Sequence, residues 1–196
     1  MGCIQSARPQ IMFQSIATRA EVSLPELETE RLVLRAYQSS DLDVLAQIWA
    51  DPAVTRFIGN QPRPRAQVWA AMERSFGSWI MLGYGFWVVT DKAKGEILGE
   101  CGLMEALRDM SPPISGVPEA GWVFGANAWG RGYASEALGA VFAWADQSLD
   151  CAQTVCIIDP ENSSSLRLAA RIGYKVARTS TFMDAEVYVL ERPRCN

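Results

Sequence analysis

Histidine does not occur in the 196 residues of the sequence. Because imidazole is the usual general base near neutral pH, its absence excludes a Ser-His-Asp mechanism. The same absence removes the most common ligand of catalytic metal ions, so we expect no metal site. Any group that accepts a proton must therefore be a carboxylate, a tyrosine or a water molecule.

Cysteine is scarce and irregularly placed. An odd number of thiols in no metal-ligand spacing is typical of reduced cysteines, so we expect a cytoplasmic protein. Long apolar runs and a secretion signal are also missing, and no membrane partner is expected. Met1–Ser6 fits the short pattern for myristoylation, a match that we attribute to chance. The five cysteines are Cys3, Cys101, Cys151, Cys156 and Cys195.

Positive charge is not concentrated anywhere in the chain. The net charge is -4, the isoelectric point is near 5.0, and no basic run occurs. Since nucleic-acid binding needs clustered Lys and Arg, we expect no nucleic acid and a smaller partner. The length suits one domain, which we assign to residues 26–196. Residues 1–25 show neither helical nor strand periodicity, and we interpret them as an N-terminal extension.

What the sequence does contain is a regular succession of strand and helix patterns. A hairpin predicts an antiparallel middle of the sheet, and a later strand-helix-strand crossover predicts one parallel pair. The fold class is therefore mixed α/β. The expected strands are 30–35, 86–90, 97–103, 119–124, 154–158, 175–181 and 187–190, and the expected helices are 42–50, 68–82, 134–149 and 163–172.

The stretch from Glu119 to Tyr174 carries the clearest functional signal. Its first strand leads through a glycine-bearing turn into a helix. The N–H groups and the dipole at the start of such a helix favour a phosphate. Gly130 and Gly132 have no side chain that would keep an anion away from the backbone.

The same glycines also imitate a dinucleotide-binding turn, which makes an oxidoreductase the rival enzyme class. Ser135 stands where that fingerprint has its third glycine. Too few residues follow Asp159 to complete a doubly wound sheet. We therefore set the oxidoreductase aside.

Five motifs resemble those of the GNAT N-acetyltransferase superfamily: Leu27–Arg35, Gly83–Trp87, Leu98–Leu103, Trp129–Ala137 and Asp159–Ser165. Within it the chain is similar to the ribosomal-protein N-acetyltransferase (RimJ/RimL-type) group. The resemblance implies a twisted, mostly antiparallel sheet with helices on both faces. A central parallel pair would splay apart to hold coenzyme A (CoA).

The resemblance also implies acetyl-CoA as the donor. Its pyrophosphate would bind the backbone amides of residues 131–135, and its pantetheine would lie between the two parallel strands. Trp129 departs from the family's Gln or Arg, which costs little because backbone amides bind the phosphates. The cofactor-binding residues implied are Trp122, Val123, Phe124, Trp129, Gly130, Arg131, Gly132, Tyr133, Ala134, Ser135 and Asn162.

Acetyl transfer needs a neutral amine, so a group must accept the amine's proton. Glu119 is our first candidate for this base and Glu100 our second, with a water molecule as a third possibility. Ser165 sits where the group has a serine near the thioester sulfur, and Ala169 replaces the tyrosine acid of many members.

The acceptor stays open between a protein N-terminal α-amine and a small amine such as a polyamine, an amino acid or an aminoglycoside. Freeing a lysine amine at pH 7 costs about 3.5 kcal/mol more than freeing an α-amine, because their pKa values are near ~10.4 and ~7.8. The group often forms homodimers, so a second copy is an expected partner. The alternative is a catalytically silent module that binds CoA or a partner, and Glu119→Gln separates the two.

Overall fold

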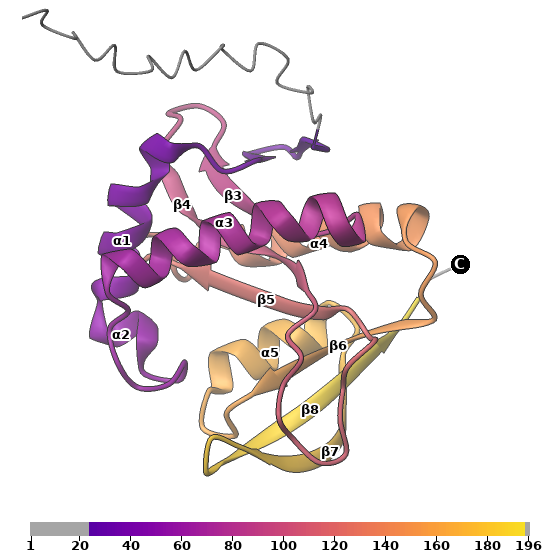
Figure 1. Ribbon diagram of the computed structural model, residues 1–196. Helices are drawn as coiled ribbons and strands as arrows, with labels where there is room; N and C mark the ends of the chain where they lie inside the picture. The colour runs from indigo at the N-terminus through magenta and orange to yellow at the C-terminus, as the bar shows by residue number, and fades with distance from the viewer. Residues whose placement is uncertain (1–23, 195–196) are drawn as a thin grey trace, which may run out of the picture.

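The computed structural model describes residues 24–194 (Figure 1). The myristoylation pattern, Cys3, Cys195 and nearly all of the expected extension lie outside the described residues. Leu24 already packs against the main core, and the Pro25 carbonyl accepts a 2.7 Å hydrogen bond from the Trp87 indole.

Eight strands form one sheet in the order β1-β2-β3-β4-β5-β6-β8-β7. All neighbouring pairs are antiparallel except β5 and β6, which are parallel. This confirms the expected mixed sheet. The strands are β1 Leu27–Glu28, β2 Leu32–Arg35, β3 Phe86–Asp91, β4 Ile97–Met104, β5 Glu119–Phe124, β6 Gln153–Ile158, β7 Lys175–Phe182 and β8 Ala185–Pro193.

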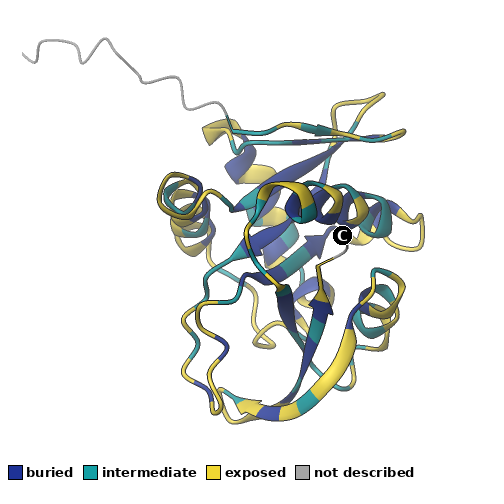
Figure 2. Cartoon of the chain, turned by 90° about the vertical axis from the view of Figure 1, so that its right-hand side faces the viewer, coloured by how far each residue is buried: buried dark blue, intermediate teal, exposed yellow. Residues whose placement is uncertain are grey.

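Helices cover both faces of this sheet. Val88 of β3 and Val123 of β5 pack against α1 and α3, whereas Cys101 and Leu103 of β4 pack against α4. Figure 2 shows the result, with buried central strands and exposed outer turns. The α-helices are α1 Leu42–Ala50, α2 Pro52–Thr55, α3 Arg65–Leu82, α4 Tyr133–Ser148 and α5 Ser163–Arg171.

Two short elements, β1 and α2, were not anticipated from the sequence. Asp41, just before α1, makes no side-chain capping bond to that helix. Its carboxylate instead accepts two 2.8 Å hydrogen bonds from Arg35 and one of 2.7 Å from the Gln38 N–H. Asp41 thus joins the end of β2 to the turn before α1.

The parallel pair opens almost as soon as it begins. Glu119 opposite Val155 is its one registered pair, and the Val155 N–H also donates to the Pro118 carbonyl. Beyond that point β5 and β6 diverge, as Figure 1 shows. The divergence separates the backbones of two central strands, and we refer to this separation as the opening between β5 and β6.

Within residues 24–194, no helix combines the length and apolarity that crossing a bilayer requires.

The crowding around Gly102 gives the first testable prediction. A Cβ at this position would lie 2.3 Å from the Gly85 carbonyl oxygen and 2.5 Å from the Phe86 Cα, both backbone atoms. Gly102→Ala should lower the free energy of unfolding by about 1–3 kcal/mol, measured by denaturant titration. In Gly139→Ala the new Cβ meets nothing within 4 Å on α4, so this control should keep or raise stability. Equal stability of the two variants would contradict the close approach of β3 to β4.

Candidate active site

The turn before α4 presents a row of free backbone donors. Among the described residues, the N–H groups of 130–135 donate to no protein acceptor, whereas those of Trp129 and Glu136 do. Gly130 and Gly132 have φ values of 71° and 82°, in the left-handed region that favours glycine. A Cβ at Gly130 would meet nothing within 4 Å, so the space outside the turn is open. This arrangement suits an anion.

An ion pair from the other end of the chain fixes this turn. Arg31 Nε donates to Glu136 Oε2 at 2.7 Å, and Arg31 Nη1 donates to the Arg131 carbonyl at 3.0 Å. Thr29 Oγ1 also donates to Glu136. Burial opposes ionisation of Glu136, but the bonds from Thr29 and Arg31 lower its pKa below the ordinary value. Arg31 lies in one of the family-like motifs, but the sequence alone did not indicate this role.

Residues at the opening between β5 and β6 form a second group. The Trp122 indole N–H donates to Ser165 Oγ at 3.3 Å. Asn162 Oδ1 caps α5 by accepting from the Ser165 N–H at 3.1 Å and from Ser164 Oγ at 2.9 Å. No described acceptor takes a bond from the Asn162 amide nitrogen, so that donor is available to a ligand. The structure brings these predicted residues together across the opening.

Other predicted cofactor residues lie apart from this group. Val123 faces α1 and α3, on the opposite side of the sheet from Trp122 and Phe124. Trp129 is 48% exposed, and its indole N–H donates to the Phe124 carbonyl at 2.8 Å. Trp129 therefore ties the turn to the end of β5. Ala134 and Ser135 contribute the backbone donors described above.

Glu100 is a buried carboxylate with two hydrogen-bond donors. Its Oε2 accepts from the Tyr37 hydroxyl at 2.9 Å, and its Oε1 accepts from the Trp49 indole at 3.0 Å. Burial raises the pKa of Glu100, although these two bonds and the charge of Arg63 oppose the rise. A carboxylate with a raised pKa is a stronger base than an exposed one.

Glu119 is also buried, and its carboxylate forms an ion pair with Arg108. Arg108 donates to both of its oxygens, at 2.6 and 2.7 Å, and also lies over the Phe182 ring. The side chains of Glu119 and Arg108 are 3% and 20% exposed. Both Glu119 oxygens thus face a charged partner, whereas both Glu100 oxygens accept from neutral donors.

Both carboxylates lie on the same face of the sheet. Glu100 of β4 pairs with Val123 of β5, so the two side chains point to the same face. Glu119 lies four residues before Val123 on β5 and therefore points to that face as well. The opposite face carries α4 and the Trp122–Ser165 bond. Among residues 24–194, no cluster of three or more His, Cys, Asp and Glu side chains is arranged to hold a metal.

The turn before α4 is an anion-binding arrangement on a mixed α/β sheet, and comparison with known proteins identifies the class of protein that uses it. Residues 31–175 match the family described as "Acetyltransferase (GNAT) domain". The chain therefore belongs to the GNAT acetyltransferase family and is an N-acetyltransferase. Acetyltransferases of this family use acetyl-CoA, and the oxidoreductase alternative is excluded.

Bacterial relatives agree with this assignment. An uncharacterized N-acetyltransferase p20 of Bacillus licheniformis is 30% identical over 76% of this chain and 82% of its own length. A putative GNAT-family acetyltransferase from Bordetella pertussis, a solved structure, is 30% identical over 86% of this chain and 99% of its own, with a TM-score of 0.75.

More distant structures share the fold alone. RimL, a ribosomal L7/L12 α-N-protein acetyltransferase in complex with coenzyme A, is 16% identical with a TM-score of 0.70, covering 86% of this chain and 98% of its own. A spermidine N-acetyltransferase from Vibrio cholerae, in complex with CoA and spermine, is 15% identical with a TM-score of 0.66, covering 85% and 97%. At these identities, membership of the ribosomal-protein group stays a prediction.

The buried Glu100 predicts a specific pH dependence of stability. Its folded pKa lies above its unfolded value of about 4.3, so between the two values the folded state holds a proton that the unfolded state lacks. Stability from this group is present below about pH 4.3 and is lost as pH rises through the folded pKa. Glu100→Gln should therefore gain stability relative to the wild type as pH rises toward 7 in urea titrations. If the difference in free energy of unfolding between Glu100→Gln and the wild type did not change with pH, the burial effect would be contradicted. Glu96→Gln, which removes one exposed carboxylate, is the control.

The Arg31–Glu136 pair predicts a change in coenzyme affinity. Arg31→Ala should raise the Kd for CoA about tenfold, because the turn loses its charged hydrogen bonds. Isothermal titration calorimetry measures this. Lys92→Ala removes an exposed pair with Glu28 and should leave the Kd unchanged. Equal Kd values for both variants would show that the turn does not need Arg31.

Proposed function

We propose that the protein transfers the acetyl group of acetyl-CoA to a primary amine, and that Glu100 accepts the amine's proton directly or through water. The observation that carries the proposal is the row of free N–H groups at residues 130–135, at the carboxyl end of β5. These donors fit the pyrophosphate of CoA because they are unpartnered, face open space and lie at a helix N-terminus.

The remaining cofactor residues have separate proposed roles. Asn162 has an unengaged amide nitrogen that is suited to donate to the pantetheine. Trp122 and Ser165 line the opening into which that arm would extend. When bound, acetyl-CoA supplies the thioester carbonyl that the amine attacks.

Glu100 is the better base of the two candidates because its oxygens are held by neutral donors. Tyr37 and Trp49 orient the carboxylate, and burial strengthens it as a proton acceptor. Glu119, our first candidate from the sequence, is held by the Arg108 guanidinium. We assign Glu119 to positioning the loop before β5.

Ser165 is proposed to assist the leaving sulfur. Its oxygen accepts the Trp122 N–H, so its own hydroxyl proton is free to donate elsewhere. A thiol with a pKa near ~8.5 loses only about 2 kcal/mol by leaving as a thiolate at pH 7, so this donation gives modest help.

Location and assembly are further parts of the proposal. Cys101, Cys151 and Cys156 are free thiols, which supports a cytoplasmic location. A homodimer stays a prediction that size measurement in solution tests.

The functional test compares two carboxylate variants. Glu100→Gln should lower kcat about 10²–10⁴-fold and leave the Kd for CoA within about twofold, because the base is lost and the phosphate turn is intact. Glu119→Gln should have the smaller effect on kcat. Acetyl-CoA-dependent thiol release over N-terminal peptides, polyamines, amino acids and aminoglycosides measures both.

The pH profile of the same assay adds a second readout. The wild-type rate should fall on acidification through a pKa above the ordinary 4.5, and Glu100→Gln should lack this limb. Full activity of Glu100→Gln together with an inactive Glu119→Gln would reverse the assignment. Tight CoA binding with no turnover of any acceptor would favour the silent binding module.

A further inference from the structure

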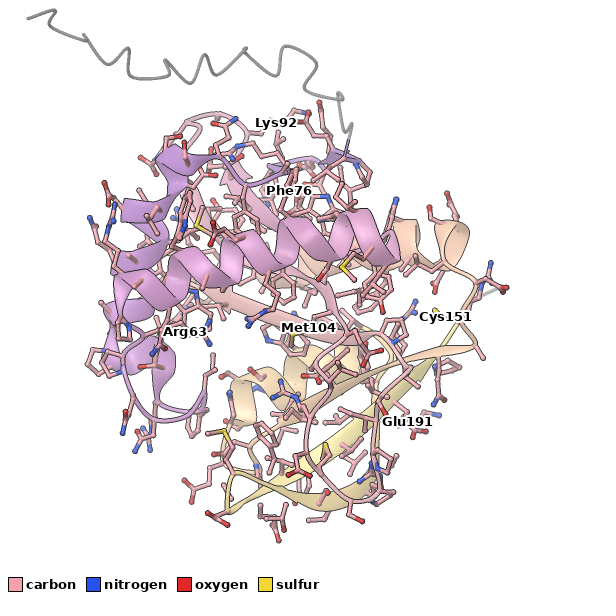
Figure 3. The ribbon with its side chains drawn as sticks, viewed as in Figure 1. Arg63, Phe76, Lys92, Met104, Cys151 and Glu191 are labelled. Atoms are coloured by element: carbon pink, nitrogen blue, oxygen red, sulfur yellow. The ribbon has the colours of Figure 1, made fainter. Side chains whose placement is uncertain are left out.

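A cation lies beside the buried carboxylate without a protein partner of its own. Arg63 follows α2, and its backbone N–H donates to the Trp49 carbonyl at 2.9 Å. Its guanidinium carbon lies 3.5 Å from the centroid of the Trp49 ring, the same indole that donates to Glu100. Among residues 24–194, the Arg63 guanidinium has neither an ion pair nor a hydrogen-bond acceptor. Figure 3 shows Arg63 next to α1 and α2. The Glu100 carboxylate is close enough to act on the pKa of Arg63.

The neighbouring arginines behave differently. Arg65, two residues further on, donates to Asp43 at 2.7 Å on the surface. Arg108 is fully engaged by Glu119 across the same face of the sheet. Arg63 is therefore a charge that the fold positions by stacking near Glu100 but, among the described residues, leaves without a hydrogen-bond acceptor.

Electrostatics around Arg63 call for an anion. Burial lowers the pKa of Arg63, and the nearby Glu100 carboxylate opposes this while the charge of Arg74 adds to it. An arginine stays protonated in proteins, so this half-buried cation is desolvated without a matching acceptor. A planar guanidinium binds a carboxylate through two parallel hydrogen bonds.

The site is accessible from outside. Arg63 borders an open groove of about 640 Å³ between α1 and residues 62–65. Asp43, Ala46, Gln47 and Ala50 of α1 line its other side, and the Asp43 carboxylate is paired with Arg65. A small acceptor can therefore approach the guanidinium without displacing a helix.

We propose that Arg63 binds a carboxylate of the acceptor, so that the enzyme acetylates amines that carry a carboxylate close to the reacting nitrogen. This rests on the proposed function, with the amine directed to Glu100 and the carboxylate to Arg63. Polyamines and aminoglycosides bring further positive charge to Arg63 and are disfavoured. A free amino acid and a peptide with an acidic residue near its N-terminus both supply the required chemistry.

The experiment compares acceptors that differ only in this charge. Amino acids are tested beside their carboxamides, and peptides with Asp or Glu at the second position beside their Asn or Gln counterparts. The wild type should favour each acid over its amide by at least about tenfold in kcat/KM. If the preference for the acid is larger among the amino acids, the natural acceptor is a free amino acid. If it is larger among the peptides, the acceptor is a peptide with an acidic second residue.

Variants separate recognition from support of the fold. Arg63→Gln should abolish the preference by raising KM for the acids, whereas any change in kcat that arises through Glu100 should fall on acids and amides alike. Arg63→Lys should retain part of the preference because the charge remains. Arg65→Gln is the matched control and should behave as the wild type. A wild type without preference, or an Arg63→Gln variant that slows acids and amides equally, overturns the proposal.

A binding measurement tests the anion site independently of turnover. N-acetylated amino acids with a free carboxylate should raise the wild-type Tm in the presence of CoA, their carboxamides should not, and Arg63→Gln should lose the shift. If no acceptor is acetylated but this shift is present, the proposed function fails and the anion site stands. If turnover occurs and neither the shift nor the acid preference does, the anion site fails alone.

Discussion

The early parting of β5 from β6 is the constraint on which the rest of the structure depends. The parallel ladder stops after Glu119 and Val155. Beyond this pair, the backbone N–H and C=O groups of β5 and β6 that face each other form no hydrogen bonds between the two strands. Because β5 leads directly through the glycine turn into α4, the free N–H groups of residues 130–135 lie at the carboxyl end of that same strand. One local deviation in the sheet therefore creates both a slot and an anion site.

Because side chains alternate along a strand, the candidate site residues are distributed over the two faces of the sheet. The face toward α4 carries Trp122, with Ser165 across the opening. The other face carries both buried carboxylates, each in a different electrostatic setting. Under the proposed roles, donor binding and proton transfer lie on opposite faces, so a single substitution on β4 or β5 changes one and leaves the other intact.

Local sequence patterns were enough to predict the fold. They were not enough to predict the contacts between residues far apart in the chain. The glycine turn, the hairpin and the crossover each have a spacing that a short window of sequence contains, and all three are present. The partners of the carboxylates come from far along the chain: Tyr37 and Trp49 reach Glu100, and Arg31 reaches Glu136. No periodicity encodes these pairings. The resemblance supplied candidate roles for the two carboxylates. Only the three-dimensional contacts distinguish Glu119, which pairs with a guanidinium, from Glu100, which accepts from neutral donors.

The bond between the Trp122 indole and the Ser165 hydroxyl has a practical consequence. This 3.3 Å contact bridges the two sides of the slot. An indole's light emission responds to its polarity and to the partner of its nitrogen, so the chain carries a native optical reporter where the strands part. Trp79, Trp87 and Trp144 pack edge to face in the core. Trp129 at the glycine turn and Trp49 beside Glu100 add emission of their own, so the Trp122 signal is read as the difference from a Trp122→Phe variant. Occupancy of the slot can thus be followed without attaching a dye.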